Sequence, residues 1–326
     1  MAKEAYYCTV KELNKLGRDA IPAQLRSNTH LIYSSPATLA FNSPGAEGFG
    51  VKRAGLAVPD SIMLIVAPGC CGRNTSLISS MREYDNRFFY LMMDETDIVT
   101  GRHLKKIPKA VEEICNCCEK RPSVVMICIT CVDALLGTDM ERVCRKAEER
   151  AGLPVRPCYM YALTREGRKP PMVHVRQSLY SLLEPKKKKG NVVNLLGFFS
   201  PLIDECELYD LLHSAGVKTI HEISRCKDYE EYQTMSEANF NLVLHPEARF
   251  AAEDFHNRLQ IPFIELRRLY QTDKIASQYQ AFGKVLGVTF SDEVYREKAE
   301  ETVAKFKEKR PDASFAIGEM HERRSI

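Results

Sequence analysis

Residues 62–72 read Ile62-Met-Leu-Ile-Val-Ala-Pro-Gly-Cys-Cys-Gly72. The first six are apolar and a Pro-Gly pair ends the run, a pattern typical of a short buried β-strand followed by a turn. A second run, Val124-Val-Met-Ile-Cys-Ile-Thr130, has the same character and leads into Cys131. Because each run continues into a helical pattern, the sequence predicts parallel strands of a doubly wound α/β sheet.

Three cysteines follow these two strands. In a doubly wound sheet of order 2-1-3-4, the first and third strands flank the crevice that binds ligands outside their carboxyl ends. Cys70 and Cys71 follow the first strand and Cys131 follows the third, each beside a predicted helix N-terminus that favours thiolate. We therefore expect the three thiols to be placed to share a metal or an iron–sulfur cluster. On the residues alone, small cysteines packed at tight turns are an equally open interpretation.

The strand–helix alternation occurs twice along the chain. Strands are expected at 62–68, 87–93, 123–130 and 155–161, and again at 191–197, 218–223, 239–245 and 262–265. Helices are expected at 73–82, 104–119, 139–151 and 176–184, and again at 203–215, 228–235, 248–259 and 273–286. Residues up to about 60 are expected to be irregular, because Pro, Gly and Ser interrupt them.

These patterns predict two Rossmann-like domains and the stub of a third. The expected divisions are a cluster-binding domain over 1–188, a second α/β domain over 189–290, and a segment over 291–326. The last segment should contain a long helix from 291 to about 309 and a strand-like piece at 314–318. The stop soon after that piece is the reason to expect a shortened third domain.

Composition limits the classes of function. The 326 residues carry a net charge of +3, which is too small to argue for nucleic acid, and we read the run at 186–189 as a solvated lysine loop. No apolar stretch approaches the ~18 residues of a membrane span, and the first residues lack the pattern of a signal peptide. We therefore expect a cytoplasmic protein with no membrane association. Its 12 cysteines should then be core residues, ligands or reactive thiols rather than disulfides.

Two C-x-x-C pairs, Cys115 with Cys118 and Cys128 with Cys131, suggest a zinc site by spacing alone. The predicted geometry opposes it. The first pair closes a helix at one edge of the sheet, and Cys131 lies at the other edge, about 25 Å away at the usual strand rise. Cys118 and Cys128 are therefore expected to be core residues.

The sequence resembles the component 1 family of nitrogenase-like oxidoreductases. The segments Ala67-Pro-Gly-Cys-Cys-Gly72, Asp97-Ile-Val-Thr-Gly101 and Thr130-Cys-Val-Asp-Ala-Leu-Leu-Gly-Thr-Asp139 are similar to the family's G-P-x-G-C-G, D-I-V-F-G and C-x-x-x-L-I-G-D-D motifs. Later, Ala238-Asn-Phe-Asn-Leu-Val-Leu-His245 and Leu259-Gln-Ile-Pro-Phe-Ile264 are similar to A-x-x-N-L-x-H-C and G-I-P segments. The resemblance implies that Cys71 and Cys131 are metal ligands, with Cys70 also in the cofactor site.

The chain departs from the family pattern at three places. No cysteine occupies Pro44-Gly-Ala46, where the first cluster cysteine is expected, and Pro246 stands where dinitrogenase has a cysteine ligand of its large metallocofactor. The third domain, which supplies that cofactor's histidine ligand, is expected to be largely missing. Reduction of N₂ is therefore not expected. His245, beside Pro246, is expected to be a strand-end histidine bonded to the backbone rather than a substrate contact.

The resemblance implies a redox protein with an iron–sulfur cluster of the 4Fe-4S type. Such a protein takes electrons from an ATP-dependent partner resembling the nitrogenase iron protein and reduces a small-molecule substrate. Two cysteines per chain are half a ligand set, so a homodimer or a paralogous component 1 subunit is expected to supply the rest. A non-catalytic scaffold for cluster or cofactor assembly and an inactive shortened paralogue remain open, so we assign neither enzyme status nor catalytic residues.

Overall fold

The computed structural model describes residues 11–12, 15, 51–69, 84, 86–130, 132, 136–159 and 169–313. The predicted helix at 73–82 and strand at 314–318 lie outside these residues. The expectation of irregular structure up to residue 60 is wrong for residues 51–55, which are helical. Val51, Ala54 and Leu56, in and just after this helix, are buried, so the segment packs into the core instead of forming an exposed loop.

The first sheet is parallel and has the order β2-β1-β3-β4. Its strands are β1 (Ile62–Ala67), β2 (Phe88–Met92), β3 (Val125–Ile129) and β4 (Val155–Tyr159). Every residue of β1 and β3 is buried, as expected for central strands covered on both faces. Strand order reverses between these two, so their carboxyl ends form the switch point of the sheet.

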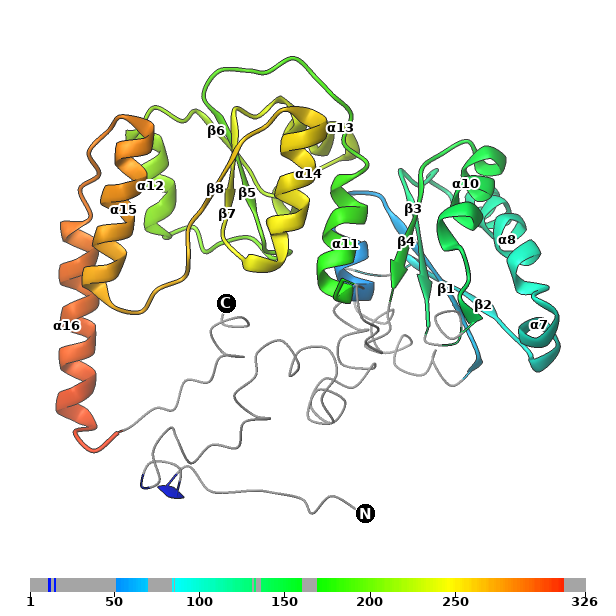
Figure 1. The fold of residues 1–326 in the computed structure, drawn as a ribbon, viewed down its shortest axis with the longest axis horizontal. Coiled ribbons are helices and arrows are strands. Elements are labelled where there is room, and N and C mark those ends of the chain that lie inside the picture. The colour runs from blue at the N-terminus through cyan, green and yellow to red at the C-terminus, as the bar shows by residue number, and fades with distance from the viewer. Residues whose placement is uncertain are drawn as a thin grey trace.

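Two helices cover the outer face of the first sheet (Figure 1). They are α8 (His103–Cys117) and α10 (Met140–Ala151), and the short helix α7 (Glu95–Thr100) precedes α8. Side chains such as Ile107 of α8 and Val143 of α10 pack on Val125, Ile127 and Ile129, the alternate residues of β3 that face outward. This packing fixes β3 beside β1 at the switch point.

The second sheet repeats the topology with the order β6-β5-β7-β8. Its strands are β5 (Val192–Leu196), β6 (Thr219–His221), β7 (Phe240–Val243) and β8 (Phe263–Glu265). The helices around it are α12 (Glu207–Ser214), α13 (Tyr229–Gln233), α14 (Arg249–Leu259) and α15 (Thr272–Leu286). Three 3₁₀ turns are interspersed: η4 (Ile223–Arg225), η5 (Thr234–Glu237) and η6 (Pro246–Ala248).

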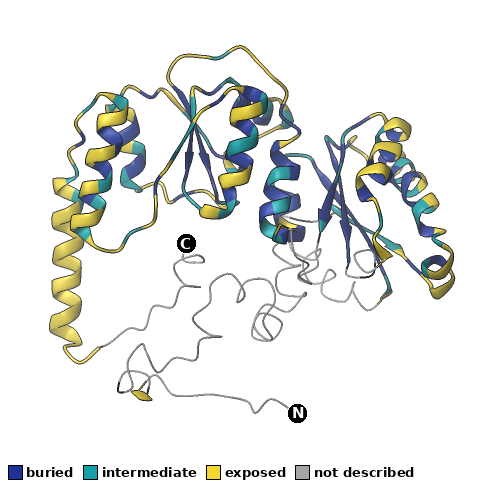
Figure 2. Ribbon diagram, in the orientation of Figure 1, coloured by how far each residue is buried: buried dark blue, intermediate teal, exposed yellow. Residues whose placement is uncertain are grey.

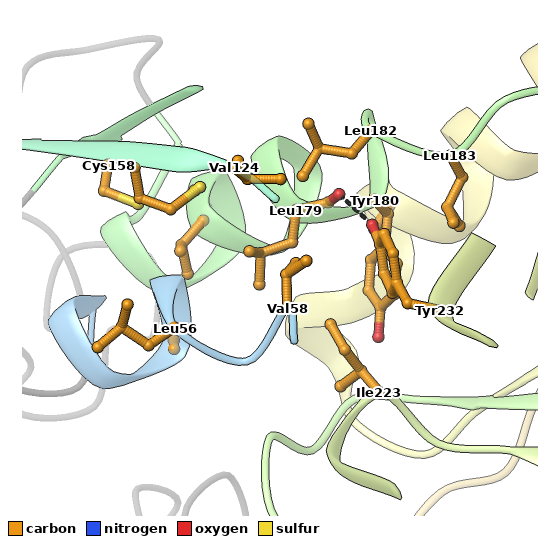
Figure 3. Close-up of a cluster of buried hydrophobic side chains, with 14 of the residues drawn as sticks. Leu56, Val58, Val124, Cys158, Leu179, Tyr180, Leu182, Leu183, Ile223 and Tyr232 are labelled. Carbon is orange, nitrogen blue, oxygen red and sulfur yellow. Dashed lines mark hydrogen bonds between the residues drawn. The ribbon is translucent and has the colours of Figure 1, made fainter. Parts of the chain in front are cut away.

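The helix α11 (Pro171–Tyr180) lies between the two sheets (Figure 1). One continuous group of buried side chains, here called the shared core, extends from the first unit through α11 to the second. Figure 3 shows part of it, where the Tyr232 hydroxyl donates to the backbone oxygen of Leu179 at 2.5 Å. The labelled members are Leu56, Val58, Val124, Cys158, Leu179, Tyr180, Leu182, Leu183, Ile223 and Tyr232.

The helix α16 (Glu293–Lys309) ends the described chain and has no buried residue (Figure 2). It extends along the far side of α15, away from the first sheet (Figure 1). The predicted α/β fold with two doubly wound sheets is confirmed, and each predicted strand in the described residues is found within a few residues of its expected bounds. The divisions at 188/189 and 290/291 stay predictions.

Candidate functional site

The carboxyl edge of the first sheet is the candidate site. β1 and β3 are hydrogen-bonded neighbours, and their register runs as far as Val66 opposite Ile129. Cys70, Cys71 and Cys131 follow these strands in the sequence but lie outside the described residues, so their ligand role stays a prediction. The described residues end one residue before Cys70, at Gly69, and one residue before Cys131, at Thr130.

Hydrogen bonds to the neighbouring strand β2 hold the turn after β1. The Tyr90 hydroxyl donates to the backbone oxygen of Pro68 at 2.8 Å, and the Met93 N–H donates to Ala67 O at 3.1 Å. A Cβ added to Gly69 would lie 3.2 Å from Met92 Cε, which is a tight contact. The turn that leads to the paired cysteines is therefore fixed from the β2 side.

Thr130 is the last residue before Cys131, and its side chain is nearly inaccessible, with 1% of its surface exposed. Its Oγ1 atom has no hydrogen-bond partner among the described residues. Buried hydroxyls are almost always bonded, because leaving one unbonded costs about 1–3 kcal/mol. The site edge therefore contains an unused donor and acceptor.

An ionic cluster fixes the turn after β2. Asp97 is buried, and its carboxylate accepts hydrogen bonds from Arg102 and Lys106, each at 2.7 Å. It also completes a capping box with Asp94 at the start of α7. The hydrogen bonds from Lys106 and Arg102 hold the pKa of Asp97 far below its usual range. The Asp97-Ile-Val-Thr-Gly101 motif thus holds α7 and α8 together, and the Asp97 carboxylate has a structural role in these contacts.

The helix α11 connects the carboxyl edges of the two sheets. The ring of His174 meets that of Tyr159, the last residue of β4, edge-on at 4.3 Å between centroids. Two residues further on, Arg176 reaches the residue after β5, where Nε and Nη2 donate to Gly197 O at 3.1 and 2.6 Å. Because a single short helix makes both contacts, the two edges lie on the same side of the molecule.

Arg176 fills the edge of the second sheet. Its side chain is buried, and it donates to Met172 O at 2.8 Å and to the Glu247 carboxylate at 2.9 Å. The guanidinium also lies over the ring of Phe199, 4.5 Å from its centroid. Burial lowers the pKa of Arg176, and the nearby Glu247 opposes that shift. The arginine is therefore a clamp between α11 and the loops after β5 and β7.

Those two loops pass very close to each other. Gly197 has a φ of +141°, and a Cβ at this position would lie 2.8 Å from both N and Cβ of His245. His245 Nδ1 accepts from the Glu247 N–H at 3.3 Å, as the backbone-bonded interpretation predicts. Phe198 contacts the His245 ring edge-on, with 5.8 Å between centroids. Pro246 begins the η6 turn and has no side-chain donor atom for a metal.

The cysteines that the structure describes are all free thiols. They are Cys115, Cys117, Cys118, Cys128, Cys144, Cys158, Cys206 and Cys226. Cys128 is fully buried, as predicted. Cys118 packs, also as predicted, against the buried side chains between the first sheet and helices α8 and α10, here called the outer core. Within the described ranges, no group of three or more His, Cys, Asp or Glu could hold a metal ion. Burial also raises the thiol pKa of Cys144 and Cys158, which keeps both protonated.

Sequence reasoning did not single out Thr130 or Arg176 as site residues. Nothing in the sequence marked Arg176, because its burial in α11, where seven of the ten residues are buried, depends on packing between the two sheets. Thr130 was not marked either, because a threonine at the end of a strand is ordinary. No helix in the described part of the chain is long and apolar enough to cross a bilayer.

Comparison with known proteins gives one family. The family model described as Nitrogenase component 1 type Oxidoreductase matches residues 47–314. The nitrogenase iron-molybdenum cofactor biosynthesis protein NifE of Rhizobium meliloti (strain 1021) is 28% identical over 224 residues, which are 66% of this chain and 47% of that protein. The nitrogenase molybdenum-iron protein alpha chain of Methanosarcina barkeri is 24% identical over 267 residues, or 77% of this chain and 48% of that one.

Solved structures agree on the fold. A structure titled "Nitrogenase Cp1 at pH 6.5" superposes with a TM-score of 0.58 at 17% identity, covering 79% of this chain and 61% of that one. A second, "Nitrogenase Cp1 at pH 5", gives a TM-score of 0.52. The chain spans about half the length of the curated relatives that it matches.

Proposed function

The chain belongs to the nitrogenase component 1 type oxidoreductases, and from this we propose that it is a redox protein with an iron–sulfur cluster at the carboxyl edge of its first sheet. It receives electrons from an ATP-dependent reductase resembling the nitrogenase iron protein and reduces a small molecule other than N₂. The observation that carries the proposal is the pairing of β1 and β3, which end in register with a cysteine a few residues beyond each.

We assign Cys71 and Cys131 as ligands and Cys70 as a third cofactor-binding residue. A 4Fe-4S cluster normally takes four protein ligands, so a second copy of the chain or a paralogous subunit would complete the set. When bound, the cluster supplies one-electron storage. The unbonded Thr130 hydroxyl fits a group that accepts a hydrogen bond at this edge.

The residues around the edge have supporting roles in this proposal. Tyr90 and Met93 hold Pro68 and Ala67, the residues of the chain just before the proposed ligands. Asp97 and its two cations hold α7 in place beside the end of β2.

Exposed apolar side chains support docking of a reductase partner at the same edge. Met92 is 62% exposed at the end of β2, Val99 is 85% exposed on α7, and Leu136 is 50% exposed after β3. Met92 is the last residue of β2, and Val99 and Leu136 follow β2 and β3 in the chain. Large exposed apolar side chains near one sheet edge are consistent with an interaction surface there.

The second sheet edge supports a substrate other than N₂. Pro246 provides no ligand atom, and Arg176 and Glu247 occupy the space beside it. We propose that a molybdenum- or vanadium-type cofactor has no place there and that the substrate is a small organic molecule. Anaerobic metal analysis that finds either metal in stoichiometric amount would contradict this.

A non-catalytic scaffold is the second candidate function. Several relatives, including the one from Rhizobium meliloti, are named as cofactor biosynthesis proteins. A scaffold would hold a cluster or a cofactor precursor for another protein and would not turn over a substrate.

One anaerobic experiment distinguishes the redox function from the scaffold function. The reconstituted protein should contain iron and sulfide and should be brown, and a colourless, iron-free preparation would refute cluster binding altogether. A reductase of the iron-protein type should then be added with ATP, and with the non-hydrolysable analogue of ATP as the control. Bleaching that requires hydrolysis, followed by recolouring when a substrate is added, supports the redox function. A cluster that never bleaches, or that passes intact to an acceptor protein, supports the scaffold.

A further inference from the structure

Thr130 lies at the position where a side chain could act on whatever Cys131 binds. It directly follows β3, one of the two strands at the switch point. Its side chain is 1% exposed, and its Oγ1 atom has no hydrogen-bond partner in the part of the chain that is described. A hydroxyl can both donate and accept, so the whole hydrogen-bonding capacity of this group is unused.

The alternation of β3 gives the face on which Thr130 lies. Ile127 and Ile129 belong to the outer core, whereas Met126 and Cys128 belong to the shared core. The two-residue period places Thr130 on the latter face, toward α11. One step beyond the last register pair, its neighbour on β1 is Ala67, a small residue of the same core.

Three other buried polar atoms in the described ranges also have no partner, and they differ from Thr130 in position. Asn194 Oδ1 and Asn241 Nδ2 lie within the second sheet, and those two side chains still bond each other at 2.7 Å. Ser224 lies in the η4 turn, which follows β6 of the second sheet. Thr130 is therefore the one of the four that lies at the edge where a ligand is expected.

We propose that the Thr130 hydroxyl is a positioning group of the cluster site, donating a hydrogen bond to a sulfur atom of the bound group. This inference rests on the proposed function. A donor directed at sulfur stabilises the more negative, reduced state, so Thr130 raises the reduction potential of the site. Without the bound group the hydroxyl is unbonded, so the apoprotein should not depend on it.

The test compares Thr130→Val, which replaces the hydroxyl by a methyl group of the same shape, with Thr130→Ser, which keeps the donor. Ser224→Ala is the matched control, because it removes another buried, unbonded hydroxyl, which belongs to the second unit of the chain. Each protein is reconstituted anaerobically with ferrous iron and sulfide. Its midpoint potential is measured by titration with dithionite and mediator dyes, and its iron retention by challenge with a ferrous chelator. Thermal unfolding of the iron-free proteins is measured in parallel.

In Thr130→Val we expect the ratio of reduced to oxidised protein at a fixed potential to fall about tenfold, a shift of about 59 mV to more negative potential for one electron. Chelation should also be faster, whereas the iron-free protein should unfold at the wild-type temperature or above it. Thr130→Ser and Ser224→Ala should keep the wild-type potential.

Two failures are distinguishable. A wild-type protein that takes up no iron refutes the proposed function. A wild-type protein that is loaded normally, with the same potential and iron retention in Thr130→Val, overturns the assignment of Thr130 alone. If Thr130→Val cannot be loaded but its iron-free form unfolds like the wild type, the hydroxyl acts on the bound group and the assignment stands. If the iron-free variant unfolds at a lower temperature and cannot be loaded, the hydroxyl is structural and the assignment falls.

Discussion

Cys71 and Cys131 are the two residues on which the proposed cluster depends most directly. Cys71→Ser and Cys131→Ser should each abolish iron binding, because a serine hydroxyl is a poor ligand for an iron–sulfur cluster. Cys70→Ser should lose iron in part. The measurement is iron and sulfide content after anaerobic reconstitution. Cys118→Ser is the control, since Cys118 packs against the outer core and should retain full iron. Full iron content in Cys131→Ser would remove it from the ligand set.

His174 should make stability depend on pH. Burial lowers its pKa from 6.5 to about 4, with a smaller effect from the nearby Lys169, so the folded protein holds it neutral where the unfolded chain is already protonated. Stability from this residue is therefore fully present above pH 6.5 and is lost as pH falls from 6.5 to about 4. The total is about 3 kcal/mol at about 1.4 kcal/mol per pH unit.

Urea unfolding at several pH values in this window measures the effect. His174→Gln cannot titrate, so its stability should fall less steeply than that of the wild type, and the difference between the two curves isolates the histidine from the carboxylates. Parallel curves for the two proteins would mean that His174 has an ordinary pKa in the folded state.

The sequence predicted the positions of some of these site residues but not of others. The cysteines could be singled out because they follow strongly apolar runs, and strand order then brings those runs together. The environments of His174 and Arg176 could not be predicted, because both depend on how α11 packs between two sheets far apart in sequence. Thr130 illustrates the same limit, since only burial reveals that a hydroxyl lacks a partner.

Among the elements, strands were predicted better than short helices. β1 and β3 are continuous apolar runs, and their bounds differ from expectation by at most two residues at either end. The sequence analysis missed α7, which is only six residues long and depends on the capping box of Asp94 and Asp97. The helix predicted at 176–184 begins five residues earlier, at Pro171, and proline is favoured in the first turn of a helix.

The close approach of the loops after β5 and β7 predicts intolerance at Gly197. Gly197→Ala should destabilise the protein by about 2–4 kcal/mol, because the added Cβ meets backbone rather than a movable side chain, and the φ of +141° is unfavourable for alanine. Gly190→Ala is the matched control, since a Cβ there has no atom within 4 Å. Chemical denaturation measures both, and equal stabilities for the two variants would contradict the tight packing.

The clamp between α11 and the second sheet predicts a cost for removing Arg176. Arg176→Met should destabilise by about 2–3 kcal/mol, because Gly197 O loses its donors and Glu247 loses its partner. Arg249→Met is the control, because Arg249 is 60% exposed and its ion pair with Glu265 should contribute about 0–1 kcal/mol. Denaturation midpoints that shift equally would show that Arg176 is no more important than a surface charge.

At the scale of the whole molecule, the ligand count predicts association. A chain with two or three cysteine ligands should form a cluster-loaded dimer, and metal should stabilise that dimer because it binds only the associated state. We expect sedimentation velocity to show a dimer when the protein is loaded, and weaker association after chelation or exposure to oxygen. An iron-loaded monomer with its cluster intact would refute sharing between chains.

The shared core means that a boundary between the two sheets in the sequence is not a boundary between independently packed units. A cut between residues 188 and 189 divides the polypeptide between its two sheets, but it leaves α11 on one side and the side chains that cover it on the other. The second piece would then expose Leu196, Tyr232 and Phe255, which are all fully buried in the intact chain. Each separated half should therefore be prone to aggregation and poorly folded by itself. The two halves should recover their structure by reassociating with each other. Genetic complementation from two fragments becomes possible in a protein whose sequence suggests two independent modules.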